Sequence, residues 1–355
     1  MSNVSSEKAT KLKSLLSISH DKDVDGLNSA AIVWRYAKSK EMDFSVMLTD
    51  YGSFEPVFSQ VAKRRDTLVI ITDLSIDDSL LDIISEALSR ATSQGCRVVW
   101  LDHHHWSDGA VRTIKSLPNS PVLKVNHKYC AAEIANKVLM PRDEISGELA
   151  RIAHDTDFNL REMDAAVALT DALTAVRFAA INKKEDVTDA IMPLLTALAS
   201  DGIKGLWDDE NKRFKESLLD SRVREYRKAR LKKMKKALAC HCDQVVNDRL
   251  VRIVEMPIGI TTTDLGTFLS EAANLEIEGQ LLPVADLLIT VSQGGMLGFR
   301  RGKESVLCNV AASLFKGGGH PYAAGGEYGM YNDFQAACDD ILLILSKTKD
   351  WVVSH

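Results

Sequence analysis

The chain has 355 residues, of which 45% are hydrophobic and 26% are charged, and its formal net charge at pH 7 is −5. This composition is typical of a globular protein and excludes wholesale disorder, and a chain of this length is expected to form two domains. The slight negative charge argues against a protein that wraps long duplex nucleic acid, so attraction of an anionic substrate would have to be local.

Targeting and membrane segments are not expected. No apolar run reaches the roughly 20 residues that a membrane span needs, and residues 1–13 lack the hydrophobic region of a signal peptide. The six cysteines are scattered and are interpreted as reduced thiols. Cys240-His241-Cys242 has no second pair nearby, and structural zinc needs four ligands, so zinc is not assigned there. We therefore expect a cytoplasmic protein that does not associate with membranes.

The first half of the chain alternates short apolar segments with amphipathic ones. The apolar segments have the length and composition of strands and lie at 15–19, 44–48, 68–71, 98–101 and 122–125. The amphipathic segments lie at 27–38, 56–64 and 79–90. This alternation predicts an α/β domain with a doubly wound, mainly parallel sheet. In such sheets, ligands bind beyond the carboxyl ends of the strands.

A helical stretch and a long basic helix follow. Apolar residues recur at spacings of three to five over 217–238, which predicts one helix. Its other face carries nine lysines and arginines between Arg222 and Lys236. This face is either an ordinary solvated surface or a surface that binds nucleic-acid phosphates. In both interpretations the helix connects two domains.

A smaller α/β domain is expected after the connector. Strands are predicted at 250–256 and 287–292, a helix near 265–273, and a glycine-rich segment covers 317–326. We therefore divide the chain into a first domain at 1–215, a basic helical connector at 216–245 and a second domain at 246–355.

Acidic residues cluster directly after the first predicted strand. Asp21, Asp23 and Asp25 occupy every second position and are followed by Gly26. Three unpaired charges are too costly for a core, so the alternatives are a solvated acidic turn and a metal site. An EF-hand loop is excluded because no glutamate follows at the twelfth position.

Three further polar clusters follow strands or lie on a helix. Asp73 comes after an apolar strand and could also be a helix cap. Three histidines follow Asp102 at another strand end, where imidazoles can bind metal and a carboxylate can fix their tautomers. Asp155 and Asp157 lie on a predicted helix, where a solvated polar face is the alternative.

The four clusters together predict one metal centre at the edge of one sheet. Carboxylate and imidazole donors suit Mn²⁺, with Mg²⁺ as the alternative, better than thiolate-selective metals. Two such ions can share one carboxylate, lower the pKa of a bridging water and clamp the attacking and leaving oxygens of a phosphoryl transfer.

The order of these motifs resembles the DHH phosphoesterase superfamily. The series is Asp-x-Asp, a strand-end Asp, Asp-His-His and a later Asp, and the segment from Gly298 to Gly326 resembles the associated C-terminal substrate domain. The resemblance covers about 17–326. It implies two metal ions, with Asp23 on the first and Asp25 on the second.

The resemblance also implies roles for the later motifs. Asp73 would bridge both ions, and His103 and Asp155 would complete the second site. Asp102 would orient a histidine, and His104 would face the substrate phosphate or leaving oxygen. His105 and Asp157 are additional candidates without an assigned role.

One position departs from the family pattern. Much of the family has a histidine four residues before the first paired aspartate, where this chain has Ser19. Asp21, kept as an additional candidate ligand, or His20 could compensate, since the loop resembles that of the RecJ-like branch.

The second domain is expected to hold the substrate. Gly317, Gly318 and Gly319 lack Cβ atoms, so that their amides could approach a phosphate, and His320 could donate to it. Arg300 or Arg301 could pair with a phosphate or stack on a base.

The resemblance predicts hydrolysis of short single-stranded nucleic acid or nucleotides, as in the nano-RNase and 3′-phosphoadenosine 5′-phosphate phosphatase branch. The alternatives are a RecJ-like single-strand exonuclease, a pyrophosphatase or polyphosphatase, a cyclic dinucleotide phosphodiesterase, and a degenerate binding module. The oligomeric state is left open, with a homodimer as one alternative.

Overall fold

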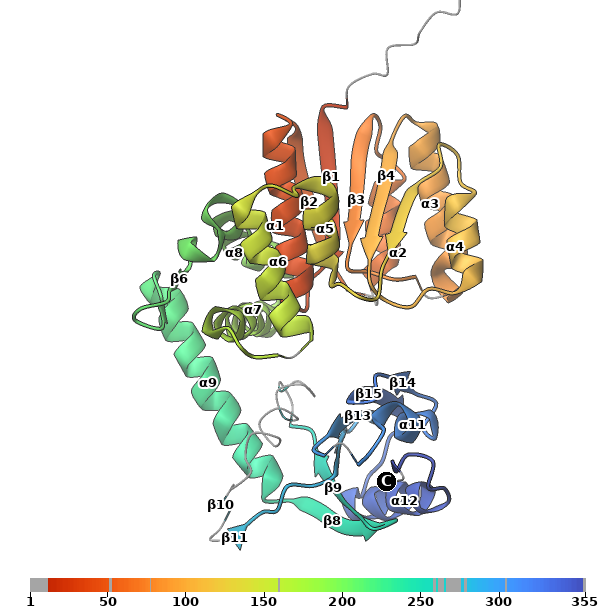
Figure 1. The fold of residues 1–355 in the computed structure, drawn as a ribbon, viewed down its shortest axis with the longest axis vertical. Coiled ribbons are helices and arrows are strands. Elements are labelled where there is room, and N and C mark those ends of the chain that lie inside the picture. The colour runs from red at the N-terminus through yellow and green to blue at the C-terminus, as the bar shows by residue number, and fades with distance from the viewer. Residues whose placement is uncertain are drawn as a thin grey trace, which may run out of the picture. The chain divides into compact units, whose positions relative to one another are not determined.

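The computed structural model describes the chain from residue 12 to 353, except 51–52, 77, 159, 258–259, 261–264, 266–275, 278–279 and 304 (Figure 1). The chain divides into two compact units, Met1–Arg224 and Glu225–His355, each of which is described by itself. Within the described residues, no helix combines the length and apolar character needed to cross a membrane.

A five-stranded parallel sheet forms the centre of the first unit, with the strand order β2-β1-β3-β4-β5. Its strands are β1 Ser14–His20, β2 Asp43–Thr49, β3 Thr67–Thr72, β4 Arg97–Asp102 and β5 Val122–Val125. The sequence of β3 is TLVIIT, and five of its six residues are buried. Such continuous apolar runs arise because both faces of a parallel sheet are covered.

Helices cover both faces of this sheet, as expected for a doubly wound fold. Helix α1 packs against β1 and against α5, α6 and α8. On the other face, α3 packs against both α2 and α4 (Figure 1). The helices are α1 Val24–Ser39, α2 Phe54–Val61, α3 Leu81–Ser93, α4 Asp108–Lys115, α5 Ala131–Leu139, α6 Glu144–Asp157, α7 Asp164–Lys183 and α8 Val187–Asp201. Short 3₁₀ turns η2 Asp78–Leu80 and η3 Gly202–Gly205 and a hairpin of β6 Trp207–Asp208 and β7 Arg213–Phe214 complete the unit.

The strand order fixes where a ligand can bind. Strand β1 lies between β2 and β3, so the chain winds in opposite directions from β1. In open α/β sheets, this reversal leaves a crevice outside the carboxyl ends of the strands. His20 ends β1, Asp73 follows β3 and Asp102 ends β4. The motifs identified in the sequence therefore lie at this edge of the sheet.

The predicted connector is helix α9, Ser217–Leu238, and the division between the two units falls within it. Leu219, Val223, Met234 and Leu238 are buried, as the periodicity predicts. Leu231 differs, since 42% of it is exposed although it belongs to the same apolar pattern.

A mixed six-stranded sheet forms the second unit, with the order β14-β15-β13-β12-β9-β8. The strands are β8 His241–Val246, β9 Arg249–Glu255, β12 Leu287–Val291, β13 Met296–Arg301, β14 Gly318–Gly319 and β15 Ala323–Glu327. Helices α11 Cys308–Ser313 and α12 Phe334–Ser346 close the core around Phe299 and Trp351. A separate pair is formed by β10 Glu276–Ile277 and β11 Gln280–Leu281. The α/β class of both parts is confirmed, while the helix predicted near 265–273 lies almost wholly outside the described residues.

Candidate metal centre

The loop between β1 and α1 presents the first carboxylate. Asp23 is the N-cap of α1: its Oδ1 accepts a hydrogen bond from the Gly26 amide at 2.9 Å, and its Oδ2 lies 2.9 Å from His20 Nδ1. A Cβ at Gly26 would lie 2.3 Å from the His20 carbonyl oxygen. The turn can therefore close only with glycine at this position.

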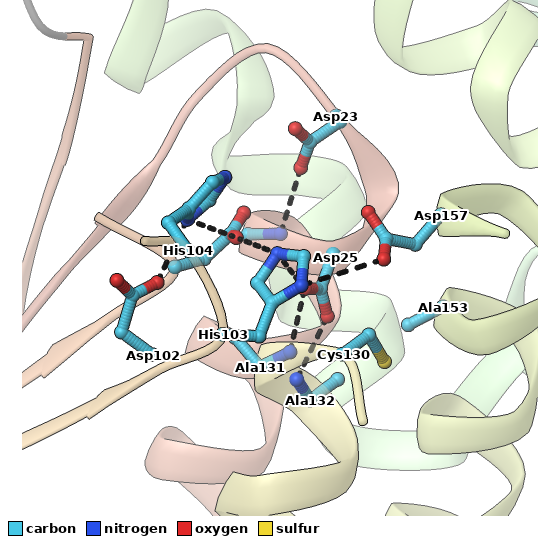
Figure 2. Close-up of polar contacts among 12 residues, drawn as sticks. Asp23, Asp25, Asp102, His103, His104, Cys130, Ala131, Ala132, Ala153 and Asp157 are labelled. Carbon is cyan, nitrogen blue, oxygen red and sulfur yellow. Dashed lines mark hydrogen bonds and ion pairs between the residues drawn. The ribbon is translucent and has the colours of Figure 1, made fainter. Parts of the chain in front are cut away.

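Asp25 is held by the N-terminus of another helix. Its two carboxylate oxygens accept hydrogen bonds from the amides of Ala131 and Ala132, both at 2.7 Å, at the start of α5 (Figure 2). These amides would otherwise lack partners, and the helix dipole favours a negative charge there. The Asp25 side chain, which is only 2% exposed, is thereby fixed by two backbone amides.

Asp73 lies at the centre of the site in an unusual backbone conformation. Its φ is 57°, in the left-handed region that aspartate tolerates better than most residues. Asp73 Oδ1 lies 3.3 Å from His103 Nε2, and Oδ2 lies 3.7 Å from His20 Nδ1. Oδ2 is buried and has no hydrogen-bond partner among the described residues. A buried carboxylate oxygen without a hydrogen bond is costly, and a bound cation would satisfy it.

The segment after β4 contributes two histidines with different partners. His104 Nδ1 lies 2.8 Å from Asp102 Oδ1, and the indole nitrogen of Trp106 donates to Asp102 Oδ2 at 2.6 Å. His103 points toward the other aspartates, with Nδ1 3.6 Å from Asp157 Oδ2 and Nε2 3.8 Å from Asp25 Oδ2 (Figure 2). His104 is thus oriented by Asp102, whereas His103 faces the carboxylate cluster.

Three overlapping groups of side chains have the geometry to hold a cation. In each group, one ligand atom per residue lies within 4.8 Å of the others. The groups are His20, Asp23 and Asp73; Asp25, His103 and Asp157; and Asp73, Asp102, His103 and His104. Asp73 and His103 each belong to two groups, which fits two neighbouring ions. All donors are oxygen or imidazole nitrogen, the set that suits Mn²⁺ or Mg²⁺.

The carboxylates raise one another's pKa values. Burial and the charges of Asp73 and Asp157 raise the pKa of Asp25, and burial and Asp23 raise the pKa of Asp73. Burial and the charge of Asp73 outweigh the opposing charge of His103 and raise the pKa of Asp157 to about 6. Burial alone would lower the pKa of His103, but Asp73 and Asp157 raise it to about 10. The cluster thus favours bound positive charge, either protons or metal.

The structure separates Asp155 from Asp157. The Asp155 side chain is buried, and its Oδ1 accepts a hydrogen bond from the Glu162 amide at 2.8 Å. Asp155 belongs to none of the three groups, whereas Asp157, two residues further along α6, faces His103. Residues two apart on a helix point in different directions, so only one of them can face the cluster.

Ser19 and Asp21 do not face the cluster either. Ser19 Oγ donates to the Gly26 carbonyl at 2.7 Å and lies 2.7 Å from Thr72 Oγ1. Asp21 pairs with Arg177 of α7 at 3.2 Å. The histidine next to Ser19, His20, instead occupies the position beside Asp23.

Two partners of the site were missed from the sequence. Asp50 follows β2 and lies 3.6 Å from His20 Nε2, and it also pairs with Lys22. Its place after a strand was the same signal that identified Asp73, so it could have been found. Arg177 lies in the middle of a long helix, and no sequence pattern indicates its contact with Asp21.

The predicted substrate residues of the second unit lie on neighbouring strands. Arg300 and Ala323 are paired across β13 and β15, and β14 pairs with β15. A Cβ at Gly317 would lie 2.0 Å from the Gly325 carbonyl oxygen, whereas one at Gly318 would meet nothing within 4 Å. Strand pairing therefore explains Gly317, while the space beside the Gly318 Cα is open.

His320 and its neighbours form the turn between these strands. The His320 amide donates to the Ala323 carbonyl at 2.7 Å, and the His320 ring stacks on Tyr322 with centroids 5.2 Å apart. His320, Gly318 and Gly319 are exposed, and Arg300 and Arg301 are partly exposed. These residues remain a predicted substrate surface.

Comparisons with known proteins find a related family and related folds. Residues 16–168 match the model of the DHH family, N-terminal domain. The fold is similar to an exopolyphosphatase-related protein from Bacteroides fragilis, with 14% identity and a TM-score of 0.52 over 96% of this chain and 93% of that one. A comparison with curated proteins finds no match.

Two further solved structures share the fold. RecJ from Thermus thermophilus, solved in complex with Mn²⁺, is 16% identical with a TM-score of 0.52; the match covers 96% of this chain and 53% of that one. The pGpG-specific phosphodiesterase PggH from Vibrio cholerae is 14% identical with a TM-score of 0.52, covering 94% of this chain and 99% of that one.

Proposed function

Because the chain carries a domain of the DHH family, we propose that it is a phosphoester hydrolase that uses two divalent metal ions, Mn²⁺ in preference to Mg²⁺. The observation that carries the proposal is the pair of donor groups around Asp73 and His103. Residues from four separate segments converge there, and their mutual repulsion is relieved only by bound positive charge.

We assign the ligands from this geometry. Asp23 and His20 would hold one ion, Asp25, His103 and Asp157 would hold the other, and Asp73 would serve both. Asp157 replaces Asp155 in this assignment because Asp157 belongs to one of the three donor groups and Asp155 to none of them. When bound, the two ions would supply an activated water and neutralise charge on the phosphoryl oxygens.

His104 and Asp102 are proposed to handle the proton of the leaving oxygen. Burial alone would lower the pKa of His104, but Asp102 outweighs this effect and raises it. Burial alone would raise the pKa of Asp102, but the contacts with His104 and Trp106 lower it. A charged imidazole held through Nδ1 carries its other proton on Nε2, and the His104 side chain is 37% exposed.

The proposed substrates are short single-stranded oligonucleotides or nucleotides. The solved relatives include a pGpG-specific phosphodiesterase, whose chain is matched over 99% of its length. Arg300, Arg301, Gly317–Gly319 and His320 are proposed to bind a phosphate or base, since arginine and glycine amides are suited to phosphate.

A RecJ-like single-strand exonuclease is the second candidate, and the basic face of α9 favours it. Of the nine cations between Arg222 and Lys236, six are exposed. A cationic helix face attracts a nucleic-acid backbone of any sequence. A processive enzyme needs this attraction more than an enzyme that degrades dinucleotides does.

The test is Mn²⁺-dependent hydrolysis of a labelled RNA dinucleotide, a labelled long single strand and 3′-phosphoadenosine 5′-phosphate, side by side. Faster loss of the dinucleotide or of the nucleotide than of the long strand supports the proposal. Processive shortening of the long strand supports the second candidate. No hydrolysis of any substrate, with Mn²⁺ binding intact, would refute both and leave a pyrophosphatase or polyphosphatase, a cyclic dinucleotide phosphodiesterase or a binding module.

A further inference from the structure

A groove runs along the open edge of the sheet in the first unit. Strand β5 pairs with β4 on one side only, and α4 and α5 flank its other side. The groove has a volume of about 460 Å³, which is within the range of small-ligand sites. It is lined by Val111, Lys115, Leu123, Lys124, Val125, Asn126, Tyr129, Ile134, Lys137 and Val138.

Three lysines give the groove a positive charge. Lys115, Lys124 and Lys137 come from α4, β5 and α5, all three are exposed, and none forms an ion pair with any described residue. Lys137 lies over the ring of Tyr129, which also lines the groove. No acidic side chain lines it. In a chain with a net charge of −5, this is a local concentration of unpaired cations beside an aromatic ring.

The groove begins next to the candidate metal centre. The Asn126 amide, at the end of β5, donates to the Asp102 carbonyl at 3.0 Å. His127 Nδ1 lies 2.7 Å from the His103 carbonyl oxygen. The carboxyl end of β5 is therefore joined by one backbone and one side-chain contact to the segment that carries His103 and His104. A chain bound at the metal centre could continue directly into the groove.

We propose that this groove binds the single-stranded nucleic acid that extends beyond the phosphate being cleaved. Three phosphates would lie against the three lysines, and a base would stack on Tyr129 or replace Lys137 over its ring. The proposal rests on the proposed function and deepens it, since it gives the substrate a second binding region within the first unit. It predicts that affinity rises when the substrate is longer than a dinucleotide.

An extended peptide is the competing occupant of an open strand edge, and the structure disfavours it. Strand β5 has four residues, starts after Pro121 and carries Lys124. Short length, proline and lysine are the features that protect edge strands from pairing with another chain. The charge nevertheless fits an acidic peptide, so an acidic peptide belongs in the test.

The test is binding of a fluorescent eight-nucleotide oligouridylate to the full chain in the presence of EDTA, measured by anisotropy. Lys115→Glu/Lys124→Glu/Lys137→Glu is compared with Lys13→Glu/Lys40→Glu/Lys63→Glu. The second variant changes the charge equally, but its exposed lysines precede β1, β2 and β3 and do not line the groove. We expect at least a tenfold weaker affinity for the first variant and less than a twofold change for the second.

Salt dependence provides an independent readout. Each phosphate neutralised on a single strand contributes about −0.7 to the slope of log K against log salt concentration. Removing three lysines should therefore reduce the steepness of the slope by about 2. Lys115→Gln/Lys124→Gln/Lys137→Gln should give the same reduction, which separates lost contacts from repulsion by the introduced glutamates.

The proposed binding of nucleic acid in the groove would be overturned if both glutamate variants weakened oligouridylate affinity equally. An unchanged salt dependence of binding in the first variant would overturn it as well. Tight binding of octaglutamate that depends on the same three lysines would also overturn it, since the occupant would then be an acidic peptide. The outcome is separable from the proposed function, because dinucleotide hydrolysis with Mn²⁺ tests the metal centre in the same preparations. Dinucleotide hydrolysis without lysine-dependent binding of the octanucleotide refutes only the proposed groove function. Lysine-dependent binding of the octanucleotide without dinucleotide hydrolysis refutes only the proposed hydrolase function.

Discussion

Replacing Asp73 by asparagine is the sharpest test of the two-ion centre. Asparagine keeps the size of the side chain and tolerates the positive φ of 57°, so the fold should persist. It removes the one carboxylate that belongs to two of the three donor groups found among the described residues. Because burial and Asp23 raise the pKa of Asp73, ionising it costs stability, and the metal-free variant should be at least as stable as wild type at pH 7.5.

The size of the effect follows from linkage between binding and folding. Mn²⁺ at 100 times its Kd stabilises a folded protein by about 2.7 kcal/mol. For a unit of this size, that corresponds to a rise in Tm of about 5–10 °C. We expect this rise in wild type and less than about 2 °C in Asp73→Asn at the same Mn²⁺ concentration.

The assay is thermal unfolding with EDTA and with Mn²⁺, together with hydrolysis of the RNA dinucleotide. Asp43→Asn is the matched control, since Asp43 is exposed and starts β2 at the opposite edge of the sheet. The control should keep both the Tm shift and the activity. If Asp73→Asn retained the full Mn²⁺ shift and near-normal turnover, the assignment of Asp73 as the shared ligand would be wrong.

Three further predictions concern individual side chains. Because the pKa of Asp157 is raised to about 6, ionisation of Asp157 destabilises the metal-free protein as the pH rises from about 4 to about 6. The free energy of unfolding of Asp157→Asn, measured with urea in EDTA, should therefore exceed that of wild type by about 1–2 kcal/mol above pH 6 and equal it below pH 4. His104→Gln should lower kcat on the dinucleotide about 100-fold while keeping the Mn²⁺-induced Tm shift, and an equal loss of that shift would make His104 a ligand instead. Arg300→Ala and His320→Ala should raise KM for oligonucleotides and change the rate of hydrolysis of a small generic phosphodiester by less than about twofold. A large loss of activity on the generic phosphodiester would refute the division of roles between the units.

The fold class could be predicted because its signal is local. The apolar run TLVIIT and its counterparts alternate with amphipathic stretches, and only a sheet covered on both faces buries both. Helix α9 was predicted at its observed bounds, because apolar spacing along a helix is a property of neighbouring residues. The exposure of Leu231 could not be predicted, since it depends on what packs beside the helix.

The candidate ligands were predicted as residue types at strand ends, but their partners were not. The sequence indicated that Asp23, Asp25 and Asp73 would meet, because the carboxyl ends of parallel strands share one edge. It did not indicate that two amides of α5 hold Asp25, because that contact joins residues 106 and 107 positions apart.

The directions of the Asp155 and Asp157 side chains show what only the tertiary structure decided. Both lie in one short polar segment of α6, and sequence alone gives no reason to prefer the second. The rotation of α6 about its own axis turns Asp157 toward His103 and Asp155 toward the Glu162 amide. The sequence by itself determined the chemical character of the site, since the residue types define which donor atoms are present. Packing of the helices against the sheet determined which donors face one another, because helix rotation depends on contacts with the whole core.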